Sequence, residues 1–371
     1  MLPRRESRFA FANAMTVTCF RAFLRRISLQ PARVQAQQAT LLLAAWFALA
    51  PPAQAARAYV SNEDDGTVTV VDTERLEGLG TISVGKRPRG LALSHDGKRL
   101  YVALSGLPKC PPPMTDADCA KLPRDVEADG VAVIDTATLA PAGKLRGVSD
   151  PERVDLSRDD RTLFVSEEDA ARLAALDLRN GSVRARTPVG REPEGVRVSA
   201  DGRWVLVTSE EENTLLIIDA HTHALQATAR VGQRPRDVVV APDNRTAYVS
   251  GEADGSVYRV ALPSGAPAMP LLQLHSGARP MGVALDAASG RLYVTTGRGG
   301  TVAVISIADQ HLIGEVAAGA RPWGVALTGH GTRLLTANGP GGDLAVIDTR
   351  TLAVLGRVPT GHGSWGVVAE P

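Results

Sequence analysis

The chain has 371 residues, of which 44% are hydrophobic and only 4% aromatic, so its core must be built mainly from Val, Leu, Ile and Ala. The net charge is +1, but residues 1–55 hold seven Arg and one Glu, which leaves the remainder at −5. No basic stripe with interleaved aromatic residues occurs, so the composition argues against a nucleic-acid partner.

The N-terminal segment has the pattern of a secretory signal peptide. Basic residues precede an apolar run over residues 41–50, two prolines end that run, and Ala53-Gln54-Ala55 supplies small residues for cleavage. We therefore predict that residues 1–55 are removed on export to a periplasm, with Met1 or Met15 as the start. The run is shorter than the roughly 20 apolar residues of a permanent membrane span. A retained membrane anchor is the alternative.

Beyond this segment one short motif recurs. In most copies a charged residue precedes a proline, and a glycine often follows two positions after the proline. Its seven copies are centred on Pro88, Pro151, Pro193, Pro235, Pro280, Pro322 and, with serine in place of proline, Ser364. Four of the six intervals are 42 residues, one is 45 and the first is 63. A period near 42 with several short apolar runs per unit is typical of a β-propeller.

A single repeat contains four predicted strands, over residues 195–199, 203–208, 214–218 and 225–229. Each has the alternating or apolar character of a strand, and Asp-Gly at 201–202 predicts a hairpin turn between the first two. An aspartate ends the third strand of most repeats, where we expect its carboxylate to cap the following turn.

The two ends of the chain complete one another. Residues 58–62 form a second strand without a first, and residues 365–369 form a first strand without a second. We therefore predict an all-β, seven-bladed β-propeller over residues 56–371, with four antiparallel strands per blade. The ring is closed by N-terminal strands plus a C-terminal innermost strand, which leaves no unpaired edges for aggregation.

The long first interval implies an insertion of about 21 residues, in a loop over about 104–128. It contains Cys110 and Cys119, the two cysteines left after removal of residues 1–55. Two cysteines in one loop of an exported protein suggest a disulfide between them.

With the repeats aligned, the chain resembles the YVTN-type β-propeller family. The resemblance rests on Tyr59-Val60-Ser61-Asn62, on residues 84–90 and on the phrase over 131–138. Within that family it is most similar to exported propellers associated with pyrroloquinoline-quinone-dependent alcohol catabolism. The resemblance implies an accessory protein, with a periplasmic quinoprotein dehydrogenase or its accessory proteins as partners, and it supplies no catalytic residues.

The residue after each proline is expected to point to the central channel. Around the ring these residues are Arg89, Glu152, Glu194, Arg236, Met281, Trp323 and Trp365. We predict that the charged ones, together with Arg87 and Arg234, bind carboxylates, and that the two tryptophans form a stacking wall. The alternative is that the charges form ion pairs closing the hub while the tryptophans plug the channel.

These residues favour a monomeric, non-enzymatic protein that binds a small organic ligand or a partner, with pyrroloquinoline quinone or Ca²⁺ as possible ligands. The alternative is a metal-assisted hydrolase of the lactonase kind, for which the ring offers only Glu152 and Glu194 as carboxylates. A pure interaction scaffold is a third reading. His221 and His223 as a metal site, and His362 as an acid or base, have weaker support.

Overall fold

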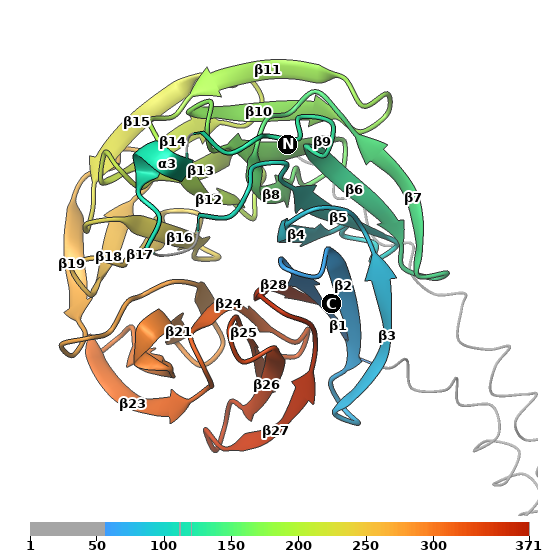
Figure 1. The fold of residues 1–371 in the computed structure, drawn as a ribbon. Coiled ribbons are helices and arrows are strands. Elements are labelled where there is room, and N and C mark those ends of the chain that lie inside the picture. The colour runs from blue at the N-terminus through green and yellow to red at the C-terminus, as the bar shows by residue number, and fades with distance from the viewer. Residues whose placement is uncertain (1–55, 111–112, 120, 371) are drawn as a thin grey trace, which may run out of the picture. The chain divides into compact units, whose positions relative to one another are not determined.

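The computed structural model describes residues 56–110, 113–119 and 121–370, and these form a ring of seven four-stranded antiparallel sheets (Figure 1). The predicted seven-bladed β-propeller is thus confirmed, with almost no helix. The predicted signal peptide falls on residues 1–55, which lie outside the described residues. No helix in the described part of the chain is long and apolar enough to span a membrane.

The strands run from the hub outward in each blade. The first blade contains β28 (Ser364–Ala369), β1 (Arg57–Asn62), β2 (Thr67–Asp72) and β3 (Glu77–Ser83). The second contains β4 (Pro88–Leu93), β5 (Arg99–Leu104), β6 (Gly130–Asp135) and β7 (Ala140–Leu145). The third contains β8 (Pro151–Leu156), β9 (Thr162–Glu167), β10 (Arg172–Asp177) and β11 (Val183–Pro188). The fourth contains β12 (Pro193–Val198), β13 (Trp204–Ser209), β14 (Thr214–Asp219) and β15 (Leu225–Arg230).

The remaining three blades follow the same order. The fifth contains β16 (Pro235–Val240), β17 (Thr246–Gly251), β18 (Ser256–Ala261) and β19 (Ala268–Gln273). The sixth contains β20 (Val283–Asp286), β21 (Arg291–Thr295), β22 (Thr301–Ser306) and β23 (His311–Ala317). The seventh contains β24 (Pro322–Leu327), β25 (Arg333–Asn338), β26 (Asp343–Asp348) and β27 (Val354–Pro359).

The ring closes within the first blade. β28 pairs antiparallel with β1, and the register places Tyr59 opposite Val368 and Val60 opposite Val367. Strands from the two ends of the described chain therefore share one sheet, as the partial repeats predicted.

The recurring glycine allows neighbouring blades to touch. A Cβ added to Gly282 would lie 2.6 Å from the backbone oxygen of Trp323 in the next blade, a contact that real Cβ atoms do not make. A hydroxyl supports the same junction, because Thr295 Oγ1 accepts from the Gly282 N–H at 2.9 Å and donates to the Trp323 carbonyl at 2.8 Å. The repeated motif therefore forms a loop and also mediates the packing of neighbouring blades.

The core lies between blades. Tyr248 and Val257 of the fifth blade pack with Leu292 and Val294 of the sixth, all of them buried. Because each middle strand is covered on both faces, its sequence is continuously apolar, whereas outer strands such as β15 remain largely exposed.

The aspartates that end third strands cap the next turn, as predicted. Asp219 Oδ1 accepts hydrogen bonds from the backbone N–H groups of His221 at 3.0 Å and Thr222 at 2.8 Å. The carboxylate thus replaces missing backbone partners in a tight turn.

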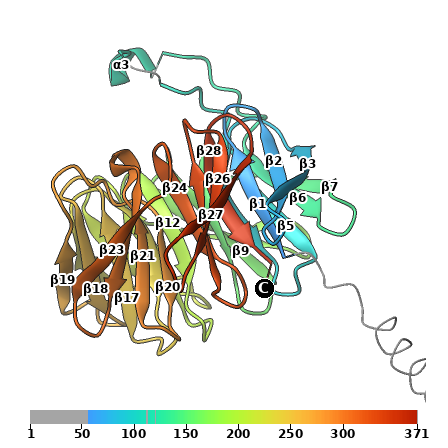
Figure 2. The same ribbon diagram turned by 90° about the horizontal axis from the view of Figure 1, so that it is seen from below.

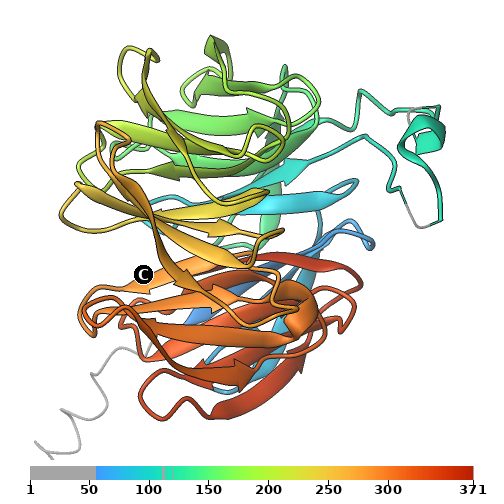
Figure 3. The ribbon, with the colours of Figure 1, turned by 90° about the vertical axis from the view of Figure 1, so that its left-hand side faces the viewer.

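The insertion connects β5 to β6 and projects from one face of the ring (Figures 2 and 3). It carries a short helix, α3 (Asp116–Cys119), which the sequence did not predict. The Cys119 side chain lies outside the described residues, so its pairing with Cys110 stays a prediction. A 3-10 turn, η1 (Gly297–Gly299), occupies the corresponding loop of the sixth blade.

Candidate functional site

Two sets of loops meet on one face of the hub, which we call the Arg-Pro face. One set precedes the innermost strands, and the other follows the second strand of each blade. The residue directly after the second strand is glutamate in four blades, at Glu63, Glu168, Glu210 and Glu252. In an alignment of the repeats the same position is Ser105, Gly297 and Gly339 in the other three blades. Carboxylates therefore encircle most of the hub, and small residues occupy the rest.

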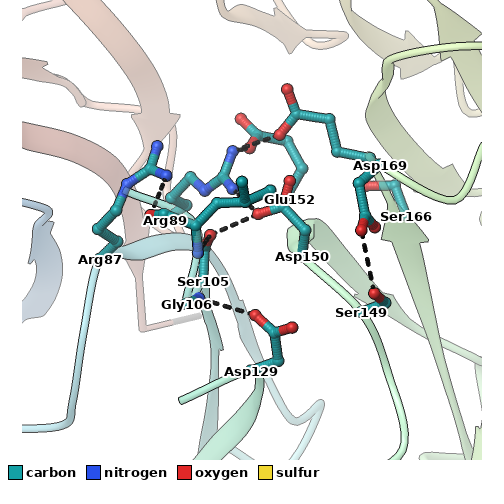
Figure 4. A network of polar contacts seen from close by, with 12 residues as sticks. Arg87, Arg89, Ser105, Gly106, Asp129, Ser149, Asp150, Glu152, Ser166 and Asp169 are labelled. Atoms are coloured by element: carbon teal, nitrogen blue, oxygen red, sulfur yellow. Dashed lines mark hydrogen bonds and ion pairs between the residues drawn. The ribbon is translucent and has the colours of Figure 1, made fainter. Parts of the chain in front are cut away.

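Arg89 lies at the centre of three carboxylates (Figure 4). It forms ion pairs with Asp150, Glu152 and Glu168, and its Nη1 lies 2.5 Å from Glu168 Oε2. Ser105 also donates to Asp150. The Arg89 side chain is only 5% exposed, so its charge is largely satisfied within the chain.

Arg87 connects the first blade to the insertion. Its Nη2 lies 2.8 Å from Glu63 Oε1, and its Nη1 donates to the Leu107 carbonyl at 2.6 Å. Lys109 of the insertion reaches the same Glu63 carboxylate at 2.8 Å. The Arg-Pro loop, the loop that begins at Glu63 and the insertion therefore share one rim.

Arg236 is the centre of a second group, the Arg236 cluster, formed with Glu194, Glu210 and Glu252. Arg236 Nη1 lies 2.6 Å from Glu210 Oε2, Arg236 Nε lies 2.7 Å from Glu252 Oε2, and Glu194 forms a third ion pair. Arg234 approaches Glu210 and Glu252 from outside, and its side chain is 52% exposed.

The Arg236 cluster holds more carboxyl groups than cations. Burial, with the nearby charge of Glu194, raises the pKa of Glu210 to about 9 despite the two arginines. Glu252 is shifted in the opposite direction: burial opposes its ionisation, but Arg236 outweighs burial and lowers its pKa. One carboxyl therefore holds a proton at neutral pH beside another that is ionised, a pairing used in acid–base catalysis.

A cavity of about 520 Å³ opens beside this cluster on the Arg-Pro face. It is bounded by loops of the fourth and fifth blades, and its lining residues are Glu192, Glu210, Glu211, Asn213, Gln233, Arg234 and Ala253. The protonated Glu210 and the partly exposed Arg234 therefore lie in the wall of one cavity.

The two tryptophans flank the hub, and cations cover both. The Arg153 guanidinium lies 4.7 Å from the centroid of the Trp365 ring and 4.0 Å from Asp237 Oδ2, so it bridges the third blade to the first and the fifth. Arg321 stacks over Trp323 at 5.0 Å. Beneath them, the innermost strands line a central channel of about 440 Å³.

The hub residues of the sixth, seventh and first blades form an arc of different chemistry, which we call the aromatic arc: Met281, Trp323 and Trp365. In the sixth and seventh blades glycine replaces the glutamate, and the Trp323 ring lies 3.4 Å from the position that a Cβ atom on Gly339 would take. Trp323 Nε1 is buried without an acceptor among the described residues. Three arginines on the same arc form no ion pair within the described ranges: Arg279, Arg298 and Arg321.

The structure thus brings Arg89 together with Glu152, and Arg236 with Arg234 and Glu194. Glu168, Glu210 and Glu252 also reach the hub, although they were not among the residues predicted there. The sequence signal that could have identified them is the glutamate found at the same aligned position in four of the repeats. No group of three or more metal-binding side chains occurs in the described ranges. His221 and His223 lie on the opposite face, and His362 is 3.0 Å from Asp65 at the rim.

Comparisons with known proteins show what the fold resembles. The family model described as the cytochrome D1 heme domain matches residues 123–251. Hydrazine synthase of Kuenenia stuttgartiensis is 19% identical, with a TM-score of 0.66, 78% of this chain covered and 92% of that chain. A candidate 6-phosphogluconolactonase of Bacteroides fragilis is 14% identical, with a TM-score of 0.67 and coverage of 86% and 99%.

Dihydro-heme d1 dehydrogenase NirN, in complex with DHE, is 17% identical, with a TM-score of 0.61 and coverage of 85% of this chain and 75% of that chain. No curated protein sequence matches the chain. At these identities the structural likeness establishes the seven-bladed β-propeller fold, which this chain shares with 6-phosphogluconolactonase-type and NirN-type propellers.

The comparisons correct one expectation. We expected a non-enzymatic accessory protein of quinoprotein alcohol catabolism, but the three similar structures named above carry the names of enzymes, and the matching family model describes a heme domain. They favour the enzymatic alternative.

Proposed function

We propose that the chain is a hydrolase of the lactonase kind, with its reacting groups in the Arg236 cluster. The observation that carries the proposal is Glu210, with its raised pKa, in the wall of the 520 Å³ cavity, sharing the Arg236 guanidinium with Glu252, whose pKa is lowered. Oppositely shifted pKa values give two neighbouring carboxyl groups separate roles as acid and base. The similar fold of a candidate lactonase supports the same reaction class by analogy.

The reaction needs one water molecule and returns a hydroxy acid. The Glu252 carboxylate accepts a proton as water attacks the acyl carbon, and the acyl C–O bond of the ring breaks. Glu210 then gives its proton to the departing alkoxide, and proton exchange with solvent restores both groups. Arg234, half exposed at the cavity wall, is suited to hold the developing oxyanion by charge-assisted hydrogen bonds.

The metal-assisted version of this chemistry does not fit the Arg236 cluster. Its three carboxylates converge on the Arg236 guanidinium, which takes the place that a divalent cation would need. We therefore route no step through a metal ion at this position.

The test is acid release from a panel of small-ring lactones, followed in a pH-stat with the purified chain. We expect turnover by the parent, and a fall of roughly 10²–10⁴-fold in kcat for Glu210→Gln. Glutamine has the shape of the protonated acid but cannot donate the same proton.

The matched control is Glu127→Gln, because the Glu127 side chain is 86% exposed and its one ion pair among the described residues is with Arg146, at 3.2 Å. This variant should retain the parent rate. Equal rates for Glu210→Gln and the parent would contradict the assigned role, and a parent rate no higher than that of buffer would contradict the lactonase proposal.

A second candidate function is the binding of a planar macrocycle with carboxylate groups, such as a tetrapyrrole. The aromatic arc and the unpaired Arg279, Arg298 and Arg321 suit stacking and carboxylate binding. The partial match to the cytochrome D1 heme domain supports this candidate. Among the described histidines, His275 and His362 are on this face; His275 contacts Glu315 of the outer strand β23, and His362 contacts Asp65. Neither contact supports a histidine as an iron ligand.

Absorbance titration with a metal-free porphyrin tests this candidate. Saturable binding that weakens in Trp323→Ala, but not in Arg75→Gln on the opposite face, is the expected result. A linear, non-saturable change would contradict it. Pyrroloquinoline quinone or Ca²⁺ as ligands, export to a periplasm, a quinoprotein partner and a monomeric state all stay predictions.

A further inference from the structure

A second cavity lies on the face opposite the Arg-Pro face, between the third and fourth blades. Its volume is about 480 Å³, and its charged wall contains Arg158, Arg161, Arg179, Arg184, His221 and His223. These side chains come from three turns, β8–β9 and β10–β11 of one blade and β14–β15 of the next. Hydrogen-bond donors of these side chains therefore face the cavity from several directions.

Two of the arginines are held in place by a buried carboxylate. Arg179 Nη2 lies 2.8 Å from Asp177 Oδ2, and Arg184 Nε lies 3.0 Å from the same oxygen. The hydrogen bonds from Arg179 and Arg184 lower the pKa of Asp177, so it stays ionised and keeps both guanidinium groups together. Each guanidinium retains further N–H donors, and less side-chain entropy is lost when such a fixed group binds an anion.

The remaining arginines increase the positive charge. Arg161 has a distant ion pair, with its Nε 3.8 Å from Asp159 Oδ2. Arg158 has no ion-pair or hydrogen-bond partner among the residues that the structure describes. The residues that line the cavity include four arginines and two aspartates, Asp159 and Asp201, so the lining itself carries a net positive charge.

The neighbouring blade adds imidazole groups. Burial, together with Arg184 and His221, lowers the pKa of His223, so its ring is neutral near pH 7 and offers one donor and one acceptor. Its ring packs edge-on against Phe164 at 6.1 Å, and the Asp219 cap holds its turn. The side chain is thus fixed at the cavity wall.

We propose that this cavity binds a phosphate group, either free phosphate or the phosphate of a small ester. Fixed arginines from separate turns suit a tetrahedral dianion better than a planar monoanion, because its oxygens accept from several directions. The site is independent of the proposed hydrolase, since the two lie on opposite faces of the ring.

The experiment is titration calorimetry of the full purified chain with inorganic phosphate and with a sugar phosphate, at constant ionic strength set by chloride. Saturable binding is expected. Arg158→Gln should weaken it by roughly tenfold, the effect of losing one hydrogen bond to a charged group. Tighter binding of the sugar phosphate would identify an ester as the ligand, whereas equal binding would identify free phosphate.

The matched control is Arg75→Gln, because Arg75 lies on the same face in the β2–β3 turn of the first blade, away from this cavity, and its ion pair among the described residues is with Asp72. It should bind phosphate as the parent does. Arg158 has no partner to lose, so Arg158→Gln should fold normally. The absence of saturable heat, or equal affinity in Arg158→Gln and the parent, would overturn the proposal.

Discussion

Replacing Arg236 with methionine is the sharpest perturbation of the hub. Methionine keeps much of the side chain's volume and removes only its charge and donors. Three carboxyl groups then lose their shared cation, and these are 4–15% exposed. A buried charge left without its partner costs about 3–5 kcal/mol. We therefore expect Arg236→Met to lower the free energy of unfolding by that amount at neutral pH.

The loss should depend on pH in a defined direction. Without Arg236, burial of the carboxyl groups is no longer opposed, so the folded-state pKa of Glu210 rises further above the unfolded value of about 4.3, and the pKa of Glu252, which Arg236 lowers, rises as well. Below about pH 4 these carboxyl groups are protonated in both the folded and the unfolded state, so the free energy of unfolding of the variant should approach that of the parent. As the pH rises, the unfolded state ionises first and the folded state loses stability. The deficit should thus be largest above neutral pH.

Urea unfolding, followed by tryptophan fluorescence at a series of pH values, measures this dependence. Arg234→Met is the control, because Arg234 shares Glu210 and Glu252 but is half exposed and should cost at most about 1 kcal/mol. Equal losses for Arg234→Met and Arg236→Met, or a deficit that does not change with pH, would refute the reasoning.

Three further predictions concern acid–base balance, blade packing and ring closure. The folded-state pKa of Glu210 is about 9, so this carboxyl group increasingly destabilises the folded state as the pH rises above the unfolded value of about 4.3. In urea titrations between about pH 6 and 9, Glu210→Gln should therefore be more stable than the parent. Gly282→Ala should lower the free energy of unfolding by about 1–3 kcal/mol through its contact with the next blade, whereas Gly314→Ala, with open space around it, should not. Deleting residues 364–369 removes β28 and should cause aggregation, seen in size-exclusion chromatography.

Most of the fold could be predicted from the sequence. The interval of 42 residues, the Asp-Gly turns and the two partial end repeats determine the blade count and the closure of the ring, because all three are local or periodic signals. The packing role of Gly282 could not be predicted, since it depends on the distance to a residue in the neighbouring blade.

The site was predicted less completely, because its chemistry depends on neighbours far apart in the chain. Arg89 and Arg236 were placed at the hub from their position after proline. Two of the glutamates that pair with Arg236 follow second strands. Only the three-dimensional ring shows that Glu210 of the fourth blade and Glu252 of the fifth blade, which also holds Arg236, both reach its guanidinium. The proton on Glu210 depends on burial, which sequence alone does not supply.

The pH profile of lactone hydrolysis tests the central claim most directly. If Glu210 acts as the acid, kcat should stay constant across neutral pH and fall as the pH rises through about 9, where Glu210 loses its proton. The fall should be absent from the residual activity of Glu210→Gln. A rate that keeps rising above pH 9, as direct attack by hydroxide would give, would contradict the account.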